Sequence, residues 1–154
     1  MTGAGDDVVI RPLSDGDIPA VVALWRGSGL LVPHNDPVAD IAFCRASRHG
    51  DVLVAEANGA IRASVMFGHD GHRGWVYYLA VDAADRRRGL GRQLMSAAEA
   101  WLAERHVRKL ELMIRNSNHA VKGFYAALGY GEEPVVVMSR WLDGTRPNHP
   151  PPAR

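Results

Sequence analysis

The sequence of 154 residues contains a single cysteine, Cys44, so no disulfide can form within the chain. Structural disulfides belong to oxidising compartments, and their exclusion makes a reducing cytoplasm the simplest location. No apolar run approaches the length that crosses a bilayer, and the first residues lack the basic-then-apolar pattern of a secretory signal. The sequence therefore predicts a cytoplasmic protein without a membrane partner.

An excess of charge of one sign is absent as well. Lysine and arginine number 18 against 17 aspartate and glutamate residues, which gives a formal net charge of +1. Nucleic-acid-binding domains usually carry a broad basic field, so nucleic acid is not expected as a partner. The seven histidines are scattered without the spacing of metal ligands, and no metal is expected.

Hydrophobic periodicity divides the chain into strands and helices. Strands are expected over 8–10, 52–56, 60–67, 75–81, 109–114 and 135–138, the last extending towards 141. Helices are expected from residue 18 to the glycine break at 27–29, and over 38–47, 90–106 and 118–128. This order predicts one α/β (α+β) domain over 8–142, with a mixed sheet, helical crossovers and flexible tails at 1–7 and 143–154.

The segment that follows the strand at 75–81 is the most informative of the chain. It reads Arg86, Arg87, Arg88, Gly89, Leu90, Gly91, Arg92, and it opens a helix. The first amides of a helix lack intrahelical partners, glycines let an anion approach them, and arginines add permanent charge. A P-loop would need Lys-Ser or Lys-Thr after the last glycine, and a dinucleotide fingerprint would need a small residue where Leu94 stands. The segment therefore predicts a pyrophosphate-binding loop of another kind.

Two motifs together resemble those of the GNAT N-acetyltransferases. Arg86-x-x-Gly89-x-Gly91 resembles the acetyl-CoA signature of that family, and Asn118 with residues 124–130 resembles its second signature. Residues 35–37, 70–74 and 77–79 further resemble the YpeA-like bacterial branch. One departure is Val121, which stands where the family usually has alanine. The resemblance implies the GNAT fold, a mixed central sheet of six to seven strands with about four helices, splayed between the fourth and fifth strands.

The same resemblance implies that an amine attacks the thioester of acetyl-CoA directly. The amides of residues 87–92 would hold the pyrophosphate, and Arg86 would brace their loop. The backbone of Leu79, Ala80 and Val81 would pair with the pantetheine arm, and an amide near Leu79 would stabilise the oxyanion. Asn118 would hydrogen-bond the cofactor arm. Tyr125 would stand near the sulfur and protonate the departing thiolate, although an isolated tyrosine at this position could equally serve packing alone.

The general base and the acceptor site stay open at this point. Base candidates are Asp70, His72 and Glu111, with Glu56 acting through water as a further one; acceptor candidates are Asn35, Asp36, Tyr77 and Tyr78. Asp36 precedes Pro37 and fits a helix N-cap equally well. The acceptor would be a small-molecule amine, or a protein N-terminus or lysine, and the family makes a homodimer an expectation. A non-catalytic acyl-CoA sensor or interaction module is the alternative, against which the presence of Tyr125 argues.

Overall fold

The structure is a computed structural model that describes residues 7–145. Its chain divides into two compact parts. The first part runs to Leu31 and resumes over Asn35–Met113, and the second comprises Val32–His34 and the chain from Ile114 onward. The arginine-glycine loop lies in the first part, whereas Asn118 and Tyr125 lie in the second.

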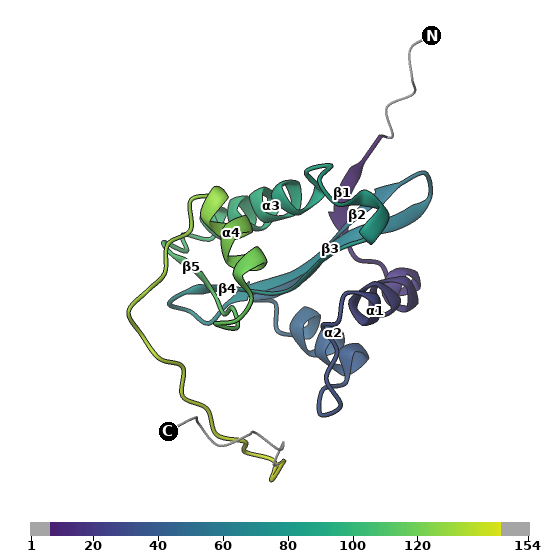
Figure 1. Cartoon of the computed structure of the whole chain (residues 1–154). Helices are drawn as coiled ribbons and strands as arrows, with labels where there is room; N and C mark the ends of the chain where they lie inside the picture. The colour runs from purple at the N-terminus through teal and green to yellow at the C-terminus, as the bar shows by residue number, and fades with distance from the viewer. Residues whose placement is uncertain (1–6, 146–154) are drawn as a thin grey trace. The chain divides into compact units, whose positions relative to one another are not determined.

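A five-stranded mixed sheet forms the centre of the first part (Figure 1). In spatial order its strands are β1 (Val9–Pro12), β2 (Gly50–Ala57), β3 (Ala60–His69), β4 (Gly74–Val81) and β5 (Leu110–Leu112). The pairs from β1 to β4 are antiparallel, and β5 runs parallel to β4. Asn58 and Gly59, with φ of 54° and 73°, form the tight turn that the sequence predicts between β2 and β3.

Helices cover both faces of this sheet (Figure 1). Helices α1 (Ile18–Gly27) and α2 (Pro37–Ala46) lie on one face, and α3 (Leu90–Glu104) lies on the other. The core under α1 and α2 is built from buried side chains of helices and strands alike: Leu13, Val21, Trp25, Ile41, Val52, Val54, Met66 and Ala80. On the opposite face, Phe67 of β3 meets Trp101 of α3 edge to face, with ring centroids 5.2 Å apart. Met66 and Phe67, successive residues of β3, thus belong to cores on opposite faces of the sheet.

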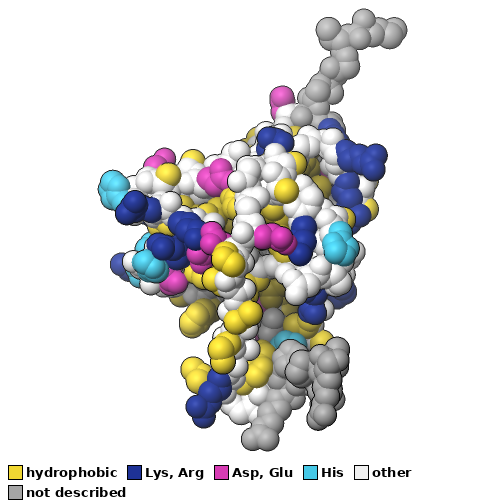
Figure 2. Space-filling model, turned by 60° about the vertical axis from the view of Figure 1, so that its left-hand side comes forward, with side chains coloured by type: hydrophobic (Ala, Val, Ile, Leu, Met, Phe, Trp, Pro, Cys, Tyr) yellow, Lys and Arg dark blue, Asp and Glu magenta, His cyan; other side chains and the backbone are white. Residues whose placement is uncertain are grey.

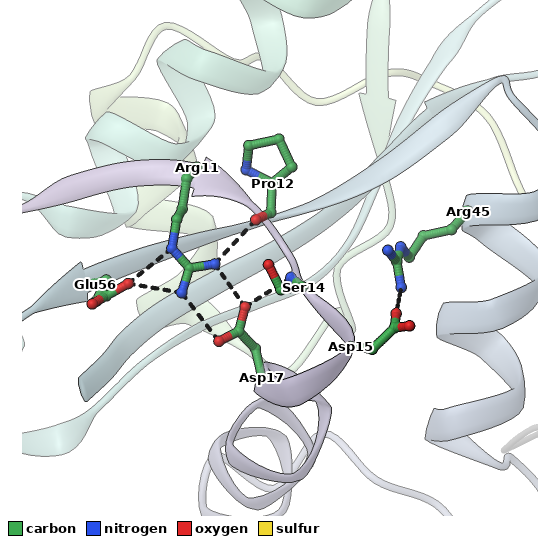
Figure 3. A network of polar contacts seen from close by, with 7 residues as sticks. All are labelled: Arg11, Pro12, Ser14, Asp15, Asp17, Arg45 and Glu56. Carbon is green, nitrogen blue, oxygen red and sulfur yellow. Dashed lines mark hydrogen bonds and ion pairs between the residues drawn. The ribbon is translucent and has the colours of Figure 1, made fainter. Parts of the chain in front are cut away.

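An ion-pair network fastens the first strand to its neighbours (Figure 3). The Arg11 guanidinium contacts Asp17 of the short 3-10 helix η1 (Asp15–Asp17) and Glu56 of β2, both at 2.7 Å. Arg11 holds the pKa of Asp17 below its usual range, because it stabilises the carboxylate. Arg45 of α2 reaches Asp15 at 2.6 Å. Glu56, one of the base candidates, is therefore engaged in a structural contact.

The second part contains one helix, α4 (His119–Ala127), within the described residues. Asn118 caps it, because its Oδ1 accepts a hydrogen bond from the Val121 amide at 3.2 Å. Gly129 follows with φ of 95°, the left-handed conformation that commonly ends a helix. The four α-helices of the described chain match the expected number.

The expectation of six to seven strands was wrong, because residues 7–145 form five. The missing strand is the one predicted over 135–138. Its side chains are exposed, from 67% for Val137 to 91% for Met138, and the segment joins no ladder in the described chain. The β-propensity of valine reflects how well it fits a pleated surface that neighbouring strands already form, so three valines in a row do not make a strand alone.

Within residues 7–145, no helix is long and apolar enough to cross a membrane.

Candidate active site

Strand β4 pairs with β3 along its whole length but with β5 only at its start, and this leaves an open edge. Its pairing with β5 covers only Gly74, Trp75 and Val76. The pairing with β3 continues to Val81 on the other side. Residues 77–81 therefore present one edge without a neighbouring strand in the first part of the chain, and an extended molecule can add to such an edge through main-chain hydrogen bonds. This edge contains Leu79, Ala80 and Val81. The pairing of β4 with β5 stops at Val76, as the expected splay between the fourth and fifth strands requires.

The arginine-glycine loop follows β4 through a second 3-10 helix, η2 (Ala83–Asp85). Gly89 occupies the N-cap of α3 in the left-handed conformation, with φ of 80°. The amide of Gln93 makes the first helical hydrogen bond, to the Gly89 carbonyl at 3.0 Å. The amides of Leu90, Gly91 and Arg92 therefore precede the helical ladder, and they have the geometry that binds an anion at a helix N-terminus.

The buried carboxylate of Asp85 links this loop to strand β3. It is 4% exposed, and its Oδ1 accepts from Arg88 Nη1 at 2.5 Å. Its Oδ2 lies 3.6 Å from Arg62 of β3. These contacts make Arg88 a brace of the loop, and the bracing role that the resemblance suggests for Arg86 stays a prediction. Because Asp85 holds the Arg88 side chain, backbone amides and the remaining arginines are left to meet an anion.

An open cavity of about 480 Å³ lies in the first part of the chain, where α2 faces the ends of β3 and β4. Its lining includes two carboxylates, Asp40 and Asp70, beside two adjacent tyrosines, Tyr77 and Tyr78. The other residues around it are Asn35, Phe43, Cys44, Ser47, His49, Gly50, Met66, Phe67, Gly68, His69 and Trp75. The volume falls in the range of small-molecule sites, which are mostly apolar with a few polar groups.

Polar contacts fix several of the lining residues. The Tyr78 hydroxyl donates to Asp40 Oδ2 at 2.9 Å, and burial raises the pKa of Tyr78, so that the phenol stays protonated. Asp70 Oδ1 accepts from the amides of His72 and Arg73, and Asp70 Oδ2 accepts from Trp75 Nε1 at 3.1 Å. These hydrogen bonds lower the pKa of Asp70 to about 2, because they stabilise its charged form. Asp70 thus lines the cavity as a permanently charged and weakly basic carboxylate.

The other predicted acceptor and base residues divide between the cavity and structural contacts. Asn35 lines the cavity, with Nδ2 3.5 Å from the Tyr78 hydroxyl. Asp36 caps α2, where its Oδ1 accepts from the Val38 and Ala39 amides at 3.0 and 3.1 Å. His72 lies exposed in the turn before β4 and is not part of the lining. Glu111 of β5 lies 3.4 Å from Lys109 and 3.7 Å from Arg73. Of the two roles that the sequence allowed for Asp36, the helix cap is the one observed.

Sequence reasoning missed five polar residues of the cavity: Asp40, Cys44, Ser47, His49 and His69. Asp40 stands one helical turn after the Asp36 cap, a spacing that could have drawn attention to it. His49 directly precedes β2, and His69 is the last residue of β3. The start of β2 pairs with the end of β3, so the two rings lie 5.0 Å apart. Glycines make this approach feasible, since a Cβ at Gly50 would lie 2.5 Å from the Phe67 carbonyl oxygen. No local sequence pattern predicts a contact between two residues that lie so far apart in the sequence.

Tyr125 is 7% exposed and lies on α4 in the second part. Its ring meets Phe124 and Tyr130 edge to face, at centroid distances of 5.0 and 5.5 Å. Burial raises the pKa of Tyr125 to about 12, so the phenol is protonated at any physiological pH. It can donate a proton and cannot serve as a base there. Within residues 7–145, no three His, Cys, Asp or Glu side chains are grouped as metal ligands would be.

Comparison with known proteins agrees with this geometry. Residues 20–130 match the model of the acetyltransferase (GNAT) family. An acetyltransferase of Yersinia enterocolitica is 42% identical over 135 residues, covering 86% of this chain and 94% of the relative. An acetyltransferase of Pectobacterium atrosepticum shows the same identity and coverage.

Solved structures share the fold at lower identity. Aminoglycoside N-acetyltransferase AAC(6')-Iy in complex with CoA superposes with a TM-score of 0.78 at 19% identity, covering 92% of this chain and 99% of the other. Glucosamine-6-phosphate N-acetyltransferase from Arabidopsis thaliana gives a TM-score of 0.67 at 20% identity, covering 90% and 100%. The sequence match, the open edge of β4 and the loop before α3 lead to one conclusion: the chain is an acetyltransferase of the GNAT family.

Proposed function

We propose that this enzyme transfers the acetyl group of acetyl-CoA to a primary amine of a small cationic molecule. The lining of the cavity is the observation that supports this choice of acceptor most strongly. The cavity beside the open edge of β4 is lined by aromatic rings and by two carboxylates, Asp40 and Asp70. Such a lining favours a compact molecule that carries positive charge, because rings and carboxylates both attract ammonium groups.

The groups that would hold acetyl-CoA fit its chemistry. The pantetheine arm contains amides that can pair with the backbone of Leu79 and Val81 along the open edge. The pyrophosphate is an anion, and the amides of residues 90–92 at the start of α3 suit it. Family resemblance assigns the remaining contact to Asn118. Its Oδ1 already caps α4, so its Nδ2 is the atom that would donate to the cofactor.

The reaction requires a neutral amine, because an ammonium group has no lone pair for attack. When the amine nitrogen bonds to the thioester carbon, negative charge builds on the carbonyl oxygen, and the Leu79 amide would stabilise it. The C–S bond then breaks, and Tyr125 would give its proton to the departing sulfur. With a pKa of about 12, the phenol is a weaker acid than a thiol, so its proton would pass to the sulfur only in concert with C–S cleavage, and the phenolate would then regain a proton from solvent. The base that takes the amine proton is not assigned, and Asp70, His72 and Glu111 stay predictions.

The test is a panel of acceptors incubated with acetyl-CoA, with release of free thiol as the readout. The panel should include polyamines, amino sugars, aminoglycosides of the kind that the structural neighbours are named for, and lysine-containing or N-terminal peptides. We expect turnover with small polycationic amines and none with peptides. Turnover with peptides alone would contradict the proposed acceptor, and a protein that binds no acetyl-CoA would contradict the whole proposal.

The acceptor preference should also depend on Asp40 and not on Asp36. Replacing Asp40 with asparagine removes a charge from the cavity lining, whereas replacing Asp36 with asparagine keeps a helix cap outside the lining. We expect the KM for the amine to rise severalfold in D40N at constant affinity for acetyl-CoA, because the asparagine Oδ1 can still accept the hydrogen bond from the Tyr78 hydroxyl. D36N is the matched control and should resemble the wild type.

A further inference from the structure

Strand β4 carries one more residue than its partner at the middle of their pairing. Ser64 of β3 faces Ala80, and Met66 of β3 faces Tyr77. Between these two pairs β3 has one residue, Val65, whereas β4 has two, Tyr78 and Leu79. This is a β-bulge. Tyr78 adopts a φ of 53°, a conformation that a bulky side chain rarely takes.

The bulge changes which side chains share a face of the sheet. In a regular strand successive side chains point to opposite faces, so Tyr77 and Tyr78 could not line one cavity. Both nevertheless do, and Ala80 beyond them is buried in the core under α1 and α2. The bulge begins two residues after Val76, where the pairing of β4 with β5 ends. It therefore sits at the start of the edge that acetyl-CoA is proposed to use.

The Tyr78 side chain is anchored on both its face and its tip. Its ring stacks on Trp25, with centroids 4.2 Å apart and planes 9° from parallel. Trp25 is fully buried, and its Nε1 donates to Ser64 Oγ at 2.9 Å. Ser64 is the β3 residue that faces Ala80, so Trp25 is tied to the strand opposite the bulge. The Tyr78 hydroxyl donates to Asp40 of α2 at 2.9 Å.

A left-handed conformation at a residue other than glycine costs free energy and persists only where surrounding contacts outweigh that cost. Aromatic stacking and a hydrogen bond to a carboxylate are contacts of sufficient strength. Trp25 and Asp40 belong to α1 and α2, so two helices act on one residue of β4. The contacts hold Tyr78 in place, two residues beyond the last residue of β4 that pairs with β5.

We propose that Tyr78 is a positioning residue, anchored by Trp25 and Asp40, which holds the β4 bulge so that the Leu79 and Val81 backbone is presented to the pantetheine arm of acetyl-CoA. The inference rests on the proposed use of acetyl-CoA. It assigns to Tyr78 a function through the backbone, in addition to any contact with the acceptor.

Two variants at this position separate the side-chain anchor from the backbone conformation. Tyr78→Phe keeps the ring on Trp25 and loses only the hydroxyl. Tyr78→Gly loses both anchors but adopts positive φ without strain. If backbone freedom were sufficient, Y78G would bind acetyl-CoA as well as the wild type. If the anchor positions the edge, Y78F should bind within about threefold of the wild type, and Y78G should lose at least about tenfold in affinity, since small misplacements cost this much.

The readout is the Kd of acetyl-CoA by calorimetry without any acceptor, so that contacts of Tyr78 with the amine do not contribute. Hydrogen–deuterium exchange over residues 77–81 is the second readout, and it should accelerate in Y78G and not in Y78F. Val21→Ala is the control for stability, because Val21 is buried in the same core and is not one of the two anchors of Tyr78. V21A should lower the Tm and leave the Kd unchanged.

Each outcome bears on a different claim. Equal affinity of Y78G and the wild type for acetyl-CoA would overturn the positioning role alone and leave the proposed function intact. A similar loss of affinity in V21A and Y78G would also overturn it, because general destabilisation would then explain the effect. Failure of the wild-type protein to bind acetyl-CoA would overturn the proposed function and this inference with it.

Discussion

Tyr125 combines deep burial with a phenol whose pKa rises to about 12, and this defines what the residue can contribute. Replacement by phenylalanine keeps the edge-to-face contacts with Phe124 and Tyr130 and removes only the proton donor. We expect Y125F to lower kcat by about a hundredfold, the usual size of a general-acid contribution, with an unchanged Kd for acetyl-CoA. Steady-state kinetics and calorimetry measure the two quantities.

Tyr130→Phe provides the matched control for that prediction, since it removes a hydroxyl from the same aromatic cluster. Its kcat should stay near the wild-type value. If Y125F turned over as fast as the wild type, Tyr125 would have only the packing role that the sequence left as its alternative.

Cys44 gives a second prediction at the scale of one residue, and it concerns pH. Burial raises the pKa of its thiol to about 11 from an ordinary value near 9. A raised pKa means that the folded state holds its proton more tightly than the unfolded state does. The stabilisation is therefore complete below about pH 9 and is lost as pH rises towards 11. Urea unfolding should show stability falling more steeply over this range in the wild type than in Cys44→Ala.

The same thiol should react slowly with iodoacetamide in the folded protein. At pH 7.5 the thiolate fraction of a group with a pKa of about 11 is roughly 100-fold below that of a thiol with a pKa near 9. Mass spectrometry of the labelled protein follows the reaction, and labelling in urea serves as the reference. Fast labelling of the folded chain would show that Cys44 is more accessible and more acidic than its surroundings indicate.

At the scale of elements, the loop before α3 depends on a glycine with a left-handed backbone. Gly89 has φ of 80°, and a Cβ added there would meet nothing within 4 Å, so strain and not collision limits substitution. A valine there should shift the backbone towards negative φ and misalign the amides of residues 90–92. We expect G89V to weaken acetyl-CoA binding at least about tenfold, which corresponds to about 1.4 kcal/mol. Calorimetry measures the change.

Gly59 is a well-matched control for that variant. It has φ of 73°, again with nothing within 4 Å of a Cβ, and it lies in the turn between β2 and β3. Gly59→Val should lower the Tm about as much as G89V does, because both replace a glycine of positive φ, and it should leave the affinity for acetyl-CoA unchanged. Equal losses of affinity in both variants would indicate general destabilisation and contradict the specific role of the loop.

Element boundaries show where sequence reasoning succeeds and where it stops. The expected helix over 90–106 is α3 at Leu90–Glu104, and the expected strand over 75–81 is β4 at Gly74–Val81. Local periodicity carried these predictions, because each element buries one face of its own pattern. The strand expected over 135–138 was wrong because strand formation needs a partner, and propensity does not supply one.

The candidate site was only partly predictable for the same reason. Arg86–Arg92 and Asn118 were proposed because their motifs are contiguous. The helix starts that the motifs imply are observed, and the binding roles stay predictions. The bulge at Tyr78 was not predicted, since a tyrosine with positive φ contradicts its own preference and depends on Trp25 and Asp40. His49 and His69 likewise meet only after β2 and β3 have paired.

At the scale of the whole molecule, basic and acidic residues nearly balance. On the face shown in Figure 2, basic and acidic side chains alternate over the left and the centre, and several basic side chains stand together at the upper right. The near balance corresponds to the formal net charge of +1. A small anion recognised by a local loop fits such a surface better than an extended polyanion does. The homodimer that the family resemblance suggests stays a prediction, which light scattering can test.

Binding of acetyl-CoA should raise the free energy of unfolding of the protein. A ligand that binds only the folded state stabilises it by about 2.7 kcal/mol at a concentration of 100 times its Kd. For a chain of this size that corresponds to a rise in Tm of roughly 5–10 °C. ADP and acetyl-pantetheine, each of which carries part of acetyl-CoA, should give smaller shifts, because one would engage only the loop and the other only the edge of β4. Differential scanning calorimetry with the three ligands tests this division. A full shift with ADP alone would show that the open edge contributes nothing, and no shift at millimolar acetyl-CoA would contradict binding at this site.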